Sequence, residues 1–111
     1  AVQGTGAAPA TLTISDGVTY DYGTVANGSS TDKSFTVTNA GGVTATSISG
    51  GGLAAPFSFK GGGYPGTGGT CGTTLAASAN CTVVVTYNPS SLGTQSDSIE
   101  VSYNDGVAGQ T

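Results

Sequence analysis

The sequence contains no histidine, arginine, tryptophan or methionine, and Lys33 and Lys60 are the only cationic side chains among its 111 residues. A nucleic-acid-binding surface needs clustered Lys or Arg to displace counterions from phosphates, and docking on an anionic membrane surface needs the same. No apolar run approaches the ~20 residues of a transmembrane helix. We therefore expect no nucleic-acid partner and no direct membrane insertion.

The lack of histidine also limits catalysis, because neither a Ser-His-Asp nor a Cys-His arrangement can be built. General acid–base chemistry would need paired carboxylates. The six acidic residues are instead scattered over expected turns and outward strand positions: Asp16, Asp21, Asp32, Asp97, Glu100 and Asp105. The sequence predicts a protein that is not an enzyme.

Cofactor and metal signatures are equally weak. Residues 61–66, GGGYPG, formally match GxGxxG, but the dinucleotide motif must open a helix and no helical pattern follows. Asp105 with Asn104, or Asp16 with Asp21, lacks calcium-loop spacing, so turn capping is the simpler interpretation. An isopeptide cross-link through Lys33 has no acidic catalyst that can be placed beside it. We expect no cofactor and no metal.

Two cysteines, Cys71 and Cys81, are present. With no further cysteine or histidine they cannot form a four-ligand zinc site. The Thr/Ala/Ser-rich segment between them and the low charge favour a disulfide, which on the chain-entropy model stabilises the fold by about 3 kcal/mol. A free pair in a reducing cytosol is the alternative. The disulfide predicts a secreted, periplasmic or cell-surface protein; because residues 1–9 carry no signal pattern, we expect any export signal to lie outside this chain.

The residues that are abundant favour β-structure. Hydrophobic residues make up 36 %, charged residues 7 %, and 20 residues are glycine. Residues 81–87 form the most β-prone run, with Cys81, Val83, Val85 and Tyr87 on one face. Apolar residues also alternate in other short runs, bounded by turn signals: 12–14, 18–22, 33–39, 43–49 (irregular), 53–59 and 99–103. About seven strands with frequent turns predict an all-β, immunoglobulin-like antiparallel β-sandwich over residues 10–111, preceded by an arm or linker at residues 1–9.

Several of these segments together resemble a known family. They read YGTVANG at residues 22–28, FTVTNAG at 35–41, Cys71, Leu75, NCTVVVTYNP at 80–89, and Gly93. In order and spacing they are similar to the bacterial ASH/Hydin-like immunoglobulin-like repeats, relatives of the major sperm protein fold. The resemblance implies a seven-stranded sandwich that occurs in tandem in surface or secreted proteins, as a spacer or adhesion module without catalytic residues.

Two features depart from the pattern of that family. The loop at 61–70 is longer and richer in glycine. Repeats of this family also end in one more strand with the letters GTG, whereas this chain ends at Gln110-Thr111 and carries VQGTG at residues 2–6. Residues 1–6 are then either the tail of a preceding repeat or a strand that completes this domain or a neighbouring one, which would produce a strand-swapped or fibre-type homo-oligomer.

Tyr64 and Pro65 are the candidate binding residues, because Tyr64 is the only large side chain in the glycine-rich loop 61–70. Tyrosine combines an apolar face with a hydroxyl, which suits a sugar ring or a protein contact. The alternative is that the loop folds back and Tyr64 covers the end of the sandwich. The predicted function is a non-catalytic structural or adhesion module that contacts neighbouring domains of its parent chain. The alternative function is a recognition head, for example of a surface fibre, that binds a glycan or surface protein through end loops including 61–70.

Overall fold

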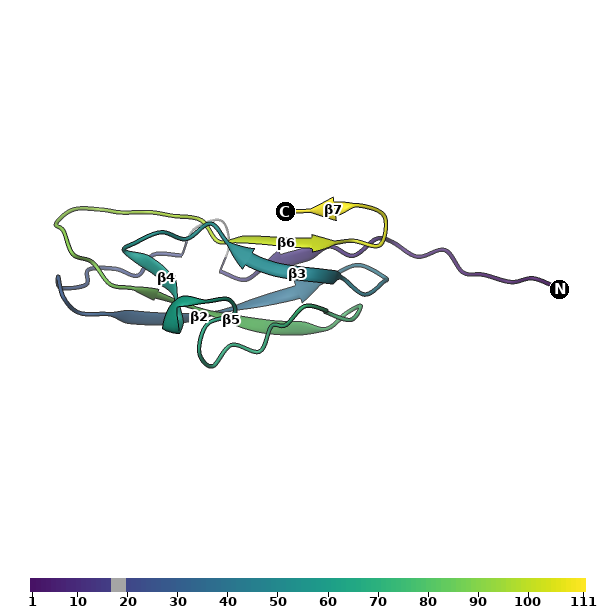
Figure 1. Cartoon of the computed structure of the whole chain (residues 1–111), viewed down its shortest axis with the longest axis horizontal. Helices are drawn as coiled ribbons and strands as arrows, with labels where there is room; N and C mark the ends of the chain where they lie inside the picture. Colours follow the sequence, from purple (N-terminus) through teal and green to yellow (C-terminus); the bar gives the residue numbers. More distant parts are fainter. Residues whose placement is uncertain (17–19) are drawn as a thin grey trace.

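The fold is a sandwich of two antiparallel sheets, seen in a computed structural model that describes residues 1–16 and 20–111 (Figure 1). The predicted all-β immunoglobulin-like architecture of about seven strands is confirmed. Besides the strands there is one short 3-10 helix, η1 (Lys60–Gly62). The strands are β1 (Leu12–Ile14), β2 (Thr31–Asn39), β3 (Thr46–Gly51), β4 (Phe57–Phe59), β5 (Asn80–Tyr87), β6 (Glu100–Asn104) and β7 (Gly109–Gln110).

The pair β2–β5 forms the centre of the larger sheet, whose order is β1-β2-β5-β4. The pair runs without interruption from Thr31 opposite Tyr87 to Thr38 opposite Asn80. One face of β5 is buried along its whole length, as the period-two pattern predicts. The smaller sheet has the order β3-β6-β7. The buried side chains between the sheets include Phe35, Val37, Ala45, Ile48, Phe59, Leu75, Cys81, Val83, Val85 and Val101.

The irregular pattern at 43–49 has a structural cause. Ala45 and Ile48 are both buried although three positions separate them, an odd spacing that normally puts residues on opposite faces of a strand. The register of β3 against β6 shifts between Thr46 and Ser49, and Ser47 between them has a φ of 52°. A β-bulge therefore restores both apolar side chains to the core.

Two predicted strands differ from the structure. In the run at 18–22, Val18 lies outside the described residues, and Tyr20 and Tyr22 are not in a strand. The strand predicted over 53–59 is shorter, because Leu53 follows Gly52, whose φ of 81° breaks the extended backbone. The seventh strand is instead β7, which pairs Gln110 with Tyr103 and Gly109 with Asn104.

Polar side chains fix the turns at one end of the sandwich. Asn39 is fully buried; its Oδ1 accepts hydrogen bonds from the backbone N–H groups of Thr11 (3.2 Å) and Gly41 (3.0 Å). Its Nδ2 donates to the carbonyl oxygens of Val43 (2.9 Å) and Leu75 (3.0 Å). One side chain thus satisfies four backbone groups in three chain segments.

The carboxylate of Asp105 closes the turn between β6 and β7. It accepts hydrogen bonds from the N–H groups of Ala108 and Val107, both at 2.8 Å, and from Gln110 Nε2 at 3.0 Å. These donors, Ala108 first, hold the pKa of the Asp105 carboxyl below its usual range. The side chain is a turn cap.

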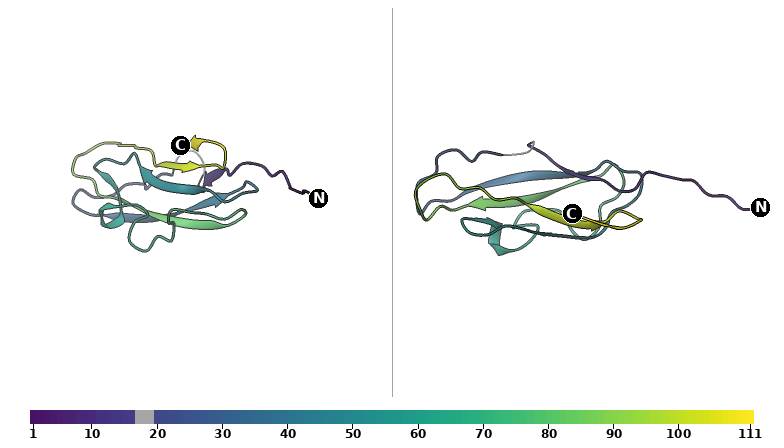
Figure 2. Two further views of the ribbon diagram at one scale, coloured as in Figure 1. Left: turned by 45° about the vertical axis from the view of Figure 1, so that its right-hand side comes forward. Right: turned by 90° about the horizontal axis from the view of Figure 1, so that it is seen from above.

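The N-terminal segment leaves the sandwich at this same end (Figures 1 and 2). Residues 1–9 are exposed and form no strand, and nothing lies within 4 Å of the side-chain position of Gly4 or Gly6. Contact with the domain begins at Ala7 and Ala8, which lie beside Gly42; the Ala8 carbonyl accepts a hydrogen bond from the Gly42 N–H (3.0 Å). With this arm extended, the chain measures 67 × 23 × 19 Å.

Candidate functional site

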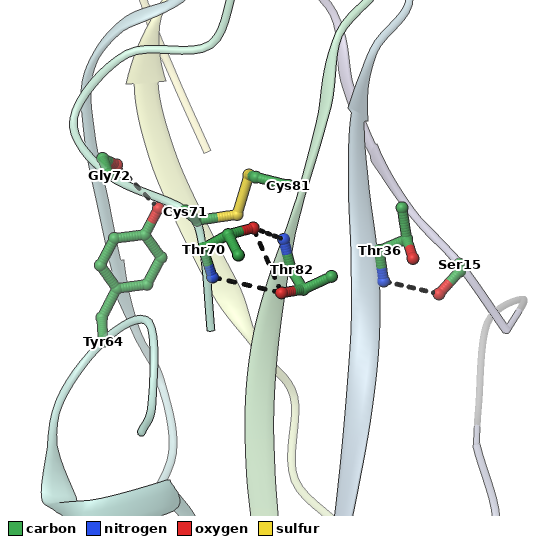
Figure 3. Close-up of a disulfide and its surroundings, with 8 residues drawn as sticks. All are labelled: Ser15, Thr36, Tyr64, Thr70, Cys71, Gly72, Cys81 and Thr82. Atoms are coloured by element: carbon green, nitrogen blue, oxygen red, sulfur yellow. Dashed lines mark hydrogen bonds between the residues drawn. A yellow bond between two sulfur atoms is a disulfide. The ribbon is translucent and has the colours of Figure 1, made fainter. Parts of the chain in front are cut away.

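The loop 60–70 is tied to β5 by the disulfide that the sequence predicts. Cys71 and Cys81 are bonded, with their Cα atoms 4.9 Å apart, and both are buried (Figure 3). Next to the bond, the Thr82 carbonyl accepts hydrogen bonds from the N–H groups of Thr70 (3.0 Å) and Cys71 (3.1 Å). The Thr82 N–H donates to Thr70 Oγ1 at 2.9 Å. The chain after the loop therefore lies along the edge of β5.

The loop 60–70 itself also lies along the edge of β5. β4 pairs with β5 only as far as Val85, and beyond that point the Val84 N–H donates to the carbonyl oxygen of Pro65 at 2.8 Å. Gly66 packs so closely that a Cβ there would lie 2.3 Å from the Val84 carbonyl oxygen. A glycine-rich loop can make this approach because no side chain intervenes. The loop thereby occupies an edge that would otherwise be open to other strands.

Tyr64 lies half-buried inside this arrangement (Figure 3). Its ring packs perpendicular to that of Phe59, with 5.9 Å between centroids. A Cβ on Gly50 would lie 2.4 Å from Tyr64 Cδ2. The Tyr64 hydroxyl donates to the Gly72 carbonyl at 2.9 Å, and burial raises the pKa of this phenol. Pro65 is also half-buried. Both residues keep part of their surface accessible, and the binding role of Tyr64 and Pro65 stays a prediction.

A hollow, which we call the aromatic cleft, lies at the end of the sandwich opposite the N-terminal arm. Its volume is about 1380 Å³, and it lies between the inner face of the larger sheet, residues 20–27 and residues 91–99. Five of the eight Phe and Tyr residues of the chain line it: Tyr20, Tyr22, Phe35, Phe57 and Tyr87. The loop 88–99, yellow-green in Figure 1, passes over this end in place of a strand of the smaller sheet.

The aromatic rings in the cleft touch one another in a chain. Phe57 stacks on Tyr87 with centroids 4.9 Å apart, and Tyr22 contacts both rings. The Tyr22 hydroxyl donates to the Val85 carbonyl at 2.8 Å, and burial, with smaller effects of Tyr20 and Asp32, raises the pKa of Tyr22 to about 12. The side chain of Tyr22 therefore holds the chain around it against the larger sheet.

Tyr20 is more accessible, with 39 % of its surface exposed. It meets Tyr22 and Phe35 edge to face, with centroids 5.1 and 5.6 Å away. The ammonium of Lys33 lies 4.9 Å from the Tyr20 ring centroid and 3.6 Å from Asp16 Oδ1. No local pattern in the sequence marks this cleft, because the rings come from four separated segments. The only local signal was the Tyr20, Tyr22 alternation, which we interpreted as a strand.

The acidic side chains are mostly engaged with the chain itself. Asp32 Oδ2 forms an ion pair with Lys60 Nζ at 3.0 Å, and its other oxygen accepts a hydrogen bond from Thr86. Hydrogen bonding to Thr86 and Lys60 lowers the pKa of Asp32. Over residues 1–16 and 20–111, no three His, Cys, Asp or Glu side chains gather as metal ligands would. Over the same residues, no helix has the length and apolar character needed to cross a membrane.

Comparison with protein families gives a match. The model of the HYDIN/CFA65/VesB-like, Ig-like domain family matches residues 10–111, which is nearly the whole chain. No curated protein and no solved structure matched.

Proposed function

Because the chain belongs to the family of HYDIN/CFA65/VesB-like Ig-like domains, we propose that it is a non-catalytic structural and adhesion module of a larger extracellular or cell-surface protein. Family membership supports a structural module within a larger protein. The Cys71–Cys81 bond is compatible with an extracellular location, since such bonds persist in oxidising compartments.

The direction of the chain carries the proposal. The arm leaves one end of the sandwich, and β7 runs from that end back along β6 (Figure 1). A chain that continued β7 would leave the sandwich at the end opposite the arm. Domains joined in this way form an extended row, in which each one separates its neighbours by roughly its own length.

Scattering from tandem copies tests this spacer role. Three copies of the chain joined end to start are expected to show a maximum dimension in small-angle X-ray scattering that grows by a constant step per copy. A two-copy protein with residues 1–6 of the second copy replaced by a long Gly/Ser linker is the control, because a flexible linker shortens the average separation relative to its length. A three-copy protein no longer than one copy would refute the spacer role.

A recognition head is the second candidate, and the partial exposure of Tyr64 favours it. In this role the loop 61–70 binds a glycan or surface protein, and Tyr64 and Pro65 make the contact. Glycan-array or partner binding should be lost in Tyr64→Ala. Tyr64→Phe is the matched control, because it keeps the ring on Phe59 and removes only the hydroxyl bond to Gly72. Binding that survives Tyr64→Ala argues against this loop.

Strand exchange with a second copy is the proposed oligomeric contact. Among the described residues, no strand pairs with the outer edge of β6 at Glu100–Ser102, because β7 covers only Tyr103 and Asn104. The exposed residues 1–6 of another copy are free to pair there. Deleting residues 1–6 should then convert a dimer or fibre to monomers in analytical ultracentrifugation. An unchanged oligomeric state after the deletion would exclude this contact.

A further inference from the structure

The aromatic cleft differs from the loop 61–70 in being hollow, accessible and lined by residues that suit a ligand. We propose that it is a binding site for a neutral oligosaccharide. The proposal does not depend on the spacer role, since a module can separate its neighbours whether or not its end binds a sugar.

Aromatic surface is the first observation. Of the large apolar side chains with high exposure, Tyr20 (39 % exposed) and Leu92 (90 % exposed) both line the cleft. The rings of Phe57 and Tyr87, which are stacked on each other, line the cleft as well. Sugar rings present C–H faces that pack on aromatic rings, and binding sites for small molecules are mostly apolar with a few placed polar groups.

An unpartnered acceptor is the second observation. Gln95 lines the cleft, and its Nε2 donates to Ser91 Oγ at 2.6 Å. Its Oε1 is buried and has no hydrogen-bond partner among the described residues. Leaving a buried acceptor without a donor is unfavourable, so a ligand that supplies an O–H group there gains affinity. A sugar hydroxyl is such a donor.

Charge decides the class of sugar. Among the described residues that line the cleft there are two acids, Asp21 and Asp97, and no Lys or Arg. Lys33 lies close by but is engaged with Asp16 and the Tyr20 ring. An anionic glycan would therefore bring its negative charge toward carboxylates without a free cation to compensate. Hydroxyl, amide and carboxylate side chains on the rim suit a polyol without charge.

An extended peptide fits this site less well. Peptides that bind β-sandwiches commonly add to an open strand edge, where backbone hydrogen bonds supply affinity. The described walls of the cleft are the inner face of the larger sheet and two segments, 20–27 and 91–99, in which no strand is formed. They offer no ladder of backbone groups for a peptide.

Nuclear magnetic resonance titration tests the proposal. The folded, oxidised chain labelled with ¹⁵N is titrated with maltohexaose, cellohexaose and chitohexaose, each to millimolar concentration, with sialyllactose as the anionic comparison. We expect at least one neutral sugar to shift the Gln95 side-chain amide and the backbone amides of 20–27 and 91–99. Shifts confined to loop 61–70, shifts caused only by sialyllactose, or no shift with any sugar would overturn the proposal.

Variants separate the binding site from the fold. Leu92→Ser changes a side chain that is 90 % exposed, so the fold is retained while affinity falls severalfold; Val107→Ser, at a site 80 % exposed on the β6–β7 turn, is the matched control. Gln95→Leu should weaken binding by about tenfold through loss of the acceptor. Tyr20→Phe should bind nearly as well as the wild type and Tyr20→Ala about tenfold more weakly, if the ring makes the contact. Equal binding by Leu92→Ser, Gln95→Leu and the wild type would place the sugar elsewhere and refute the assignment.

Discussion

The two ends of the sandwich are held by different interactions. At the arm end, a disulfide and the buried amide of Asn39 connect strands to turns through directional bonds. At the other end, packed rings and one phenol hydroxyl hold loops over the larger sheet, and a hollow remains. A disulfide or a hydrogen bond fixes the positions of the atoms that it joins, so substitutions at these residues are costly. Packing between aromatic rings fixes the positions of the loops less tightly, which leaves room for a ligand.

The largest effect is expected at Asn39. Replacing Asn39 with Leu removes four hydrogen bonds to backbone groups in a site that is fully buried. Of these groups, the Leu75 carbonyl keeps its hydrogen bond from the Ala45 N–H. We expect the free energy of unfolding to fall by about 3–5 kcal/mol. Chemical denaturation measures this change. Asn104→Leu is the matched control, since the Asn104 side chain accepts only one hydrogen bond, from the Gly106 N–H at a partly exposed turn, and should cost about 1 kcal/mol or less. Similar losses at the two sites would mean that the four hydrogen bonds of Asn39 are not what holds the arm end together.

The disulfide comes next. The double variant Cys71→Ala, Cys81→Ala is expected to lose about 3 kcal/mol in the free energy of unfolding, because the unfolded chain regains the entropy of the open loop. The loop 60–70 should also become cleavable by protease, since its Pro65 contact with Val84 is weaker without the bond. Limited proteolysis with and without reductant checks the second point. If cleavage of the variant begins instead in the segment 91–99, the arm end resists local unfolding better than the other end even without its disulfide.

The smallest effect concerns Tyr22 at high pH. The folded-state pKa of about 12 lies above the usual value of 10.0, so the folded state favours the neutral phenol. Its contribution to stability is present below pH 10 and is lost as the pH rises from there toward 12. After allowance for solvent screening of a half-buried ring, we expect about 1 kcal/mol of additional loss compared with Tyr22→Phe. Urea unfolding at a series of pH values, for the wild type and Tyr22→Phe, measures the difference. Parallel curves would mean that the hydroxyl bond to Val85 does not hold this end.

Much of the fold could be predicted from local pattern. Alternation in β2 and β5 places Phe35, Val37, Val83 and Val85 in the core, and these residues are buried. The count of seven strands is also confirmed, although one predicted strand was wrong: Tyr20 and Tyr22 pack as rings on the sheet, and the seventh strand is β7. Two residues, Gly109 and Gln110, carry no period-two signal. Their pairing depends on the Asp105 turn, which returns the chain to β6.

The sites could be predicted only in part. Two cysteines without other ligands favour a disulfide by chemistry alone, and the bond is present. Tyr64 was singled out because its neighbours are small, but its ring packs against Phe59 and Gly50, residues whose proximity no local pattern reveals. The aromatic cleft was missed for the same reason, since Tyr22, Phe57 and Tyr87 meet only after the sheet has formed.

The sequence by itself determined the class of fold and the inward faces of the long strands, and it favoured the pairing of Cys71 with Cys81. These depend on side-chain periodicity and on the chemistry of two thiols, both of which are local. Only the tertiary structure decided where loops 60–70 and 88–99 lie, that a bulge brings Ala45 and Ile48 to one face, and that five rings surround a hollow. These features depend on contacts between segments that are distant in the sequence. Such contacts form only when both sheets are in place.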